Sequence, residues 1–213
     1  MWLILLCSVI AAGIFAERVT YFYRASIRVG EFLRGLANLI QRHNFAEALH
    51  ECAGTPGPVA RVIHAAIIRH EAGREELKEI VQDAGQLEMP NLERNLGLLA
   101  TIALITPLIG LLGTVTGLIE TFVTISSHSG LASTTDLSDG IYQSLLTTAA
   151  GLVVAIPAFV AYSYLSSRVN ALMRDMERGG IEVVSLITGA RDTEEAARII
   201  DFKATSRRAR TVE

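Results

Sequence analysis

The sequence predicts an all-α membrane protein with three transmembrane helices and long cytoplasmic helical extensions. Two apolar runs, Leu96 to Ile119 and Gly140 to Leu165, contain no Asp, Glu, Lys, Arg or His. Each run exceeds the roughly 20 residues that cross a bilayer as a helix. A soluble chain of 213 residues could not cover two such runs in one core. No segment shows the sustained alternation of a β-strand.

The first span is predicted at residues 1–22. Met1 to Ala16 is uncharged and mostly apolar, but short for a span. We therefore expect the helix to continue past Glu17 and Arg18, with their side chains reaching the headgroups. A signal peptide is the alternative. The segment has no basic n-region and no A-x-A cleavage site before Glu17, so an uncleaved span is favoured.

Basic residues predict the orientation. All 19 Lys and Arg lie in 17–95 or 166–213, and none lies in 123–139. The positive-inside rule places the basic segments in the cytoplasm, with a periplasmic N-terminus and a cytoplasmic C-terminus. The predicted order after the first span is a cytoplasmic helical domain (23–95), the second span (96–122), a periplasmic loop (123–139), the third span (140–165) and a cytoplasmic helical tail (166–213).

The cytoplasmic domain reads as a series of helices. Asn44 and Glu47 predict a capping box that opens the first of them. The second has one apolar stripe and is expected to end at Gly73. A third begins near Leu77, and Pro90 predicts a kink before the second span. The stripe consists of Val59, Val62, Ile63, Ala66 and Ile67.

The tail continues the third span with an apolar stripe of Val169, Leu172, Met173 and Met176. Asp192 and Glu195 predict a capping box for a short separate helix that ends near Ile200. The final segment carries Arg207, Arg208 and Arg210. A solvated tail is the favoured interpretation of these arginines, and contact with anionic membrane lipid is the alternative.

Sequence signatures of common enzymes are missing. There is no Walker A loop, no H-E-x-x-H and no G-x-S-x-G. The histidines form no i, i+4 pair, and the basic residues are interleaved with acidic ones. Cys7 and Cys52 lie in different predicted compartments and cannot pair. We therefore expect no enzyme activity, no cofactor, no metal site and no nucleic-acid partner.

Small and hydroxylated residues recur at helical spacing inside the two later spans. Helix packing alone explains this spacing and is favoured by periodicity; a polar conduction path is the alternative. Glu120, near the outer end of the second span, is the only acidic residue within these spans. It is either a residue at the mouth of such a path or a residue that lies at the membrane interface. A titratable carboxylate at mid-depth would have to come from another polypeptide. The two faces are Thr106, Gly110, Thr114, Gly117 and Thr121, and Ser144, Thr148, Gly151 and Ala155.

Two motifs resemble a known family. PLIGLLGTVTG at 107–117 and GIYQSLLTTAAGLVVAIPA at 140–158 resemble the second-span and third-span signatures of the MotA/TolQ/ExbB proton-channel family. Glu17 and Arg18 after the first span match as well. The resemblance covers nearly the whole chain, and three spans are closer to ExbB or TolQ than to the four-span MotA.

The resemblance implies a homopentamer in the bacterial inner membrane around a dimer of single-span ExbD/TolR-like partners. The partner's transmembrane Asp would carry the proton, and the motor would act through a TonB- or TolA-like protein. A non-conducting membrane scaffold is the alternative function. Gln143 stands where many family members have Glu. The implied path-lining residues are Thr114, Thr148, Thr147, Gln143 and Glu120, and the implied helix-packing residues are Gly110, Gly113, Gly117, Gly151, Pro107 and Pro157.

Overall fold

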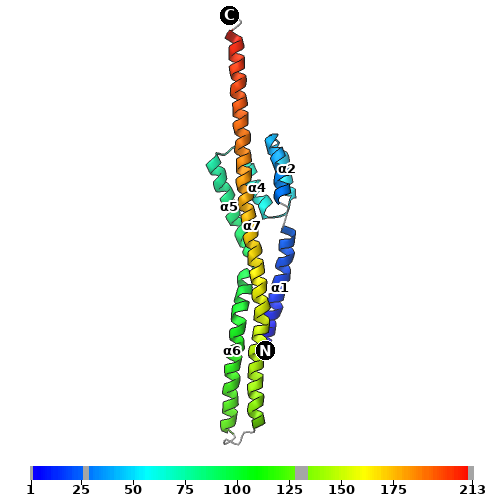
Figure 1. The fold of residues 1–213 in the computed structure, drawn as a ribbon, viewed down its shortest axis with the longest axis vertical. Coiled ribbons are helices and arrows are strands. Elements are labelled where there is room, and N and C mark those ends of the chain that lie inside the picture. Colours follow the sequence, from blue (N-terminus) through cyan, green and yellow to red (C-terminus); the bar gives the residue numbers. More distant parts are fainter. Residues whose placement is uncertain (1, 26–28, 128–133, 211–213) are drawn as a thin grey trace. The chain divides into compact units, whose positions relative to one another are not determined.

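The computed structural model describes residues 2–25, 29–127 and 134–210, with the side chains of 127, 134–137 and 194–210 left out. This part of the chain contains helices and no strand, which confirms the all-α prediction (Figure 1). Helical segments that begin at Trp2, Leu96 and Ser138 are long and apolar enough to span a membrane. The helices are α1 (Trp2–Ala25), α2 (Val29–Gln41), α3 (Phe45–Gly54), α4 (Pro58–Ile68), α5 (Arg74–Glu93), α6 (Leu96–Ser127) and α7 (Thr134–Arg210).

The chain divides into two compact units. Residues before Phe22 and the segment Glu93–Arg168 form the first unit, which holds most of the apolar helix length. Phe22–Leu92 and the part of α7 from Val169 onward form the second unit. The single helix α7 therefore contributes to both units.

The core of the second unit follows the predicted pattern. The stripe on α4 is fully buried, from Val59 to Ile67. At the start of α3, the Asn44 side chain accepts a hydrogen bond from the Glu47 amide at 3.4 Å and donates one to the Glu47 carboxylate at 2.5 Å. The first bond confirms Asn44 as the N-cap of α3. The second joins the two side chains, whereas in a full capping box Glu47 would accept from the Asn44 backbone amide, which here donates to the Leu39 carbonyl at 3.0 Å.

The end predicted for α4 is wrong. The helix ends at Ile68, and Gly73 instead precedes α5, where its carbonyl accepts from the Leu77 amide at 2.9 Å. The turn between the helices is held by Arg191 of α7. Its guanidinium donates to the carbonyls of Glu71 and Ala72 at 3.2 and 2.5 Å. A glycine signal in the sequence could not reveal this long-range contact.

Helix α5 passes through Pro90 and continues to Glu93. The helix is interrupted between α5 and α6 at Asn95, which has a left-handed φ of 63°. Asparagine tolerates this conformation better than most residues do. The Asn95 side chain donates to the Glu17 carboxylate at 3.2 Å, which ties the start of α6 to α1.

Arg18 does not extend outward as predicted. Its side chain is 3% exposed, lies 3.6 Å from the Glu17 carboxylate and stacks 5.3 Å from the centre of the Tyr21 ring. The Tyr21 ring and the Glu17 carboxylate are the neighbours of the buried guanidinium, and Glu17 also accepts the Asn95 hydrogen bond. A charged pair after a span looks the same in the sequence whether the arginine side chain reaches the headgroups or is buried in the protein.

The short separate helix predicted from Asp192 and Glu195 is also wrong, because α7 continues without a break. Apolar positions at Val183, Val184, Ile187 and Ala190 keep the buried stripe running into this region. An N-cap residue must leave helical geometry, and nothing here forces it to do so. The side chains of Arg207, Arg208 and Arg210 lie outside the described residues, so their lipid contact stays a prediction.

Candidate functional site

Helix α6 and the first part of α7 lie side by side in the first unit, and their backbones approach closely (Figure 1). A Cβ atom built on Gly151 would lie 2.9 Å from the Thr106 carbonyl oxygen and 3.2 Å from the Gly110 Cα. A Cβ atom built on Gly110 would lie 3.1 Å from the Thr147 carbonyl oxygen. Glycine is what allows this contact, as in small-residue helix pairs of other membrane proteins.

Farther along the same interface, glycine on one helix makes room for a hydroxylated side chain on the other. We call the whole contact the α6–α7 seam. Its glycine–side-chain pairs are Gly113 with Thr147, Gly117 with Ser144, and Gly140 with Thr121. These three pairs join two helices of the same chain.

Thr114 and Thr148 meet inside the seam. Their hydroxyl oxygens are in hydrogen-bond contact with each other. Thr148 also reaches the Gly110 carbonyl at 3.1 Å, and Thr114 reaches the Gly110 and Ser144 carbonyls at 3.2 Å each. Each hydroxyl has one proton to donate and two lone pairs to accept with. The pair therefore has more acceptors than protons, and the bond between the two hydroxyls can run in either direction.

The other seam threonines form bonds within their own helices. Thr106 donates to the Ile102 carbonyl at 2.6 Å, Thr121 donates to Gly117 at 2.9 Å, and Thr147 donates to Gln143 at 3.0 Å. This is the local pattern expected of a threonine that serves helix packing. Hydroxyls of Thr114 and Thr148 differ because they bond across the seam.

The two remaining path candidates lie on the surface of the first unit. Gln143 and Glu120 are exposed, with Gln143 one helical turn before Thr147. Pro107 is half-buried in α6 and Pro157 is exposed in α7. Sequence reasoning missed Gly140 as a seam residue, although its position four residues before Ser144 and eight before Thr148 was a usable signal.

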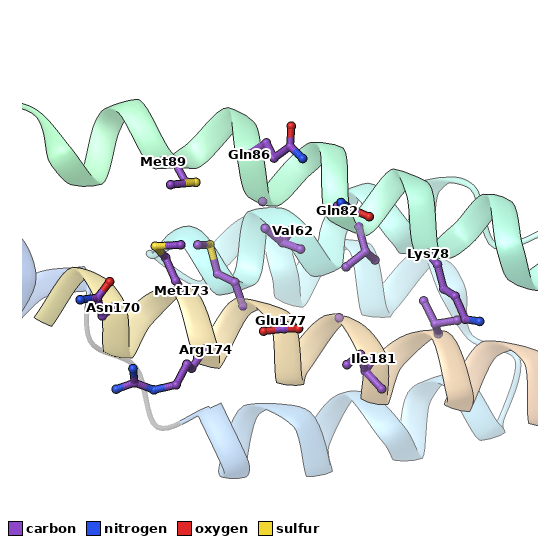
Figure 2. A pocket seen from close by; sticks show the side chains of 15 residues that line it. Val62, Lys78, Gln82, Gln86, Met89, Asn170, Met173, Arg174, Glu177 and Ile181 are labelled. Atoms are coloured by element: carbon purple, nitrogen blue, oxygen red, sulfur yellow. The ribbon is translucent and has the colours of Figure 1, made fainter. Parts of the chain in front are cut away.

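The second unit contains a cavity of about 590 Å³ between α5 and α7 (Figure 2). Methionines and aliphatic side chains make its interior, and polar side chains such as Gln82, Gln86 and Arg174 stand at the edge. One edge residue, Lys78, bonds to Glu75 at 2.7 Å, and this hydrogen bond lowers the pKa of the Glu75 carboxyl. Among the described residues, no cluster of His, Cys, Asp or Glu could hold a metal ion. The lining of the cavity is mainly apolar.

Comparison with known proteins identifies the family of the chain that contains this seam. Residues 54–178, which include α4, α5, α6 and both sides of the α6–α7 seam, match the MotA/TolQ/ExbB proton channel family. The chain belongs to this family. As a family member with three apolar helices, it is a multi-pass membrane protein of a transport-associated, channel-type family.

Individual ExbB and TolQ proteins are similar over different lengths. An ExbB homologue from Methanothermobacter thermautotrophicus, named for biopolymer transport, is 30% identical over 173 residues, which is 81% of this chain and 59% of the relative. The Tol-Pal system protein TolQ of Haemophilus influenzae is 43% identical over 88 residues, or 41% of this chain and 38% of TolQ. The biopolymer transport protein exbB1 of Vibrio cholerae is 30% identical over 184 residues, or 83% of this chain and 78% of the relative.

The chain therefore spans less than two thirds of the length of the first two of these relatives. Their names support an ExbB/TolQ-like role for the membrane-spanning part that is shared.

Proposed function

We propose that this chain is the inner-membrane subunit of a proton-driven, energy-transducing motor of the ExbB/TolQ type. It would couple the proton motive force to outer-membrane transport or to envelope integrity. The observation that carries the proposal is the hydroxyl pair of Thr114 and Thr148, which bonds across the seam inside a proton channel family. A proton moving along the membrane potential supplies about 2.3 kcal/mol per 100 mV, so a few protons suffice for a conformational step.

The hydroxyl pair can relay hydrogen bonds but cannot hold an extra proton at neutral pH. A threonine hydroxyl donates one bond and accepts two, so it can orient a protonated carboxyl or a water molecule. Within the predicted second and third spans (96–122 and 140–165) the only acidic residue is Glu120, which is exposed. We therefore assign the titrating carboxylate to a single-span ExbD/TolR-like partner. Thr147 and Gln143 would line the approach to it.

In this proposal, five copies of the chain surround two copies of the partner, and a TonB- or TolA-like protein receives the motion. Exposed apolar side chains on α6, such as Leu104, Leu108 and Leu112, offer surface for packing against neighbouring helices. Residues 23–95 and 166–213 would lie in the cytoplasm, and the loop between α6 and α7 in the periplasm.

Reconstitution tests the proposal directly. The chain is placed in proteoliposomes with and without the single-span partner, and internal pH is followed after a potential is imposed. We expect proton entry only with both proteins present, and its loss when the transmembrane Asp of the partner is replaced by Asn. A complex that assembles normally but never conducts would favour the non-conducting scaffold.

Thiol labelling tests the orientation. Burial, and secondly the neighbouring Glu51 carboxylate, raises the pKa of the Cys52 thiol to about 12. Thiolate is the reactive form, so Cys52 stays unlabelled at pH 7 in the folded protein and only Cys7 must be replaced. On a Cys7→Ala background, Ser126→Cys should react with an impermeant maleimide from the periplasmic side of intact cells.

The matched control for the labelling is Glu76→Cys, an exposed position on α5. It should react only after the cells are opened. Labelling of both positions from the same side would contradict the three-span arrangement.

Gln143 gives a second test, because its exposed amide can hydrogen-bond but does not titrate. Gln143→Leu should lower proton flux severalfold, since leucine cannot bond to water or to the partner carboxyl. Gln143→Glu should keep flux at neutral pH and add a pH dependence, because a carboxylate begins to protonate toward its ordinary pKa of about 4.3, or higher if it is desolvated. Equal flux at every pH for all three versions would remove this residue from the path.

A further inference from the structure

A groove runs between α1 and α7 in the first unit, with a volume of about 890 Å³. Small side chains make its floor, including the buried Ala11 and Ala158. Larger apolar side chains such as Phe15 and Val160 form its walls and are partly exposed. Because this unit carries the helices that are long and apolar enough to span a membrane, an open groove here would face the hydrocarbon of the bilayer.

The length of the groove corresponds to one leaflet. The two helices run in the same direction (Figure 1). The lining extends from Ser8 to Val19 on α1 and from Val153 to Tyr164 on α7. Eleven residues of helix cover about 16 Å at 1.5 Å per residue. Half of a hydrocarbon core of about 30 Å is about 15 Å. One acyl chain therefore fits along the groove.

A cation stands at the end of the groove that carries Tyr164. One turn farther along α7, the Arg168 Nε and Nη2 atoms both donate to the Tyr164 hydroxyl at 3.3 Å, and the guanidinium lies 5.5 Å from the ring centre. Among the side chains that the structure describes, no carboxylate forms an ion pair with Arg168. A guanidinium has five N–H donors, so several remain available to a phosphate oxygen.

We propose that this groove binds an anionic phospholipid, with one acyl chain between α1 and α7 and the phosphate at Arg168. Tyrosine at the level of the headgroups and arginine beyond it are the expected order at a membrane interface. The segments that follow this end carry the basic residues of the chain, and anionic lipids are concentrated in the cytoplasmic leaflet. A zwitterionic lipid could fill the groove equally well but would gain less from an unpaired arginine.

The test is native mass spectrometry of the detergent-purified protein after incubation with phosphatidylglycerol or with phosphatidylcholine of the same acyl chains. The unmodified protein should retain phosphatidylglycerol about fivefold more, the gain expected from one basic residue near the headgroups. Arg168→Gln should remove this preference. Arg178→Gln, an exposed arginine of α7 in the second unit, is the matched control and should keep it.

The groove itself is tested by Ala12→Phe, which places a ring in its lining, with Leu104→Phe as a control at an exposed position of α6. Retention of both lipids should fall with Ala12→Phe and stay unchanged with Leu104→Phe. Equal retention of the two lipids by the unmodified protein would overturn the proposal, and so would retention that Ala12→Phe leaves unchanged. If Ala12→Phe fails to fold, the Arg168→Gln comparison alone decides. None of these measurements depends on proton conduction.

Discussion

Replacing Gly151 with leucine should separate α6 from α7 and lower the melting temperature of the purified protein by about 10 °C. The reason is geometric: even a Cβ at this position would lie 2.9 Å from the Thr106 carbonyl oxygen, which belongs to a backbone that cannot swing away like a side chain. Overpacking costs typically 1–3 kcal/mol, and a contact with backbone belongs at the upper end. For a chain of about this size each kcal/mol lowers the melting temperature by roughly 2–4 °C.

The matched control is Gly97→Leu on α6, because a Cβ on Gly97 meets no atom within 4 Å. It should melt within about 2 °C of the unmodified protein. A normal melting temperature for Gly151→Leu would contradict the close approach of the two helices. A Gly151→Leu chain that stays folded but no longer forms its oligomer would show instead that Gly151 lies at a contact between copies of the chain.

The double substitution Thr114→Val with Thr148→Val should abolish energy-coupled function while the protein still folds and binds its partner. Valine keeps nearly the shape of threonine, so the seam remains filled. The change removes both hydroxyls and with them every hydrogen bond across the seam at this level. The lost bonds cost about 1 kcal/mol each in stability, which a folded membrane protein tolerates.

Function in cells is measured by outer-membrane transport or envelope integrity, and assembly by co-purification of the partner. The control is Thr116→Val, whose exposed hydroxyl bonds only to carbonyls of its own helix. It should behave like the unmodified protein. Full function in the double variant would remove the hydroxyl pair from the mechanism. Loss of the partner together with function would leave the two threonines as packing residues.

Local signals in the sequence predicted much of the fold. The apolar runs predicted the long membrane helices, and Asn44 with Glu47 predicted the start of α3 because a capping box depends on residues close in sequence. The stripe on α4 predicted its buried face for the same reason. Spacing also brought Thr114 and Thr148 to attention, although helical spacing alone cannot say which residue of one helix faces which residue of the other.

Features set by long-range contacts were not predictable in this way. Arg18 is buried beside the Tyr21 ring and the Glu17 carboxylate, and Glu17 in turn accepts a hydrogen bond from Asn95, which is 78 positions away. The turn after α4 depends on Arg191, and the register of the seam depends on glycine contacts between residues 19 to 45 positions apart in the sequence. The groove between α1 and α7 arises only when the first and last spans are placed together.

Proton flux is the measurement that tests the central claim most directly. The chain and its single-span partner are reconstituted into proteoliposomes, either unmodified or with Thr114→Val and Thr148→Val, and the amount of partner in each preparation is measured. We expect robust proton entry in the unmodified complex, and at least tenfold less in the double variant at equal partner content, which corresponds to a barrier raised by about 1.4 kcal/mol or more. Undiminished flux through a double variant that has lost both hydroxyls would contradict the assignment of the α6–α7 seam to the proton path.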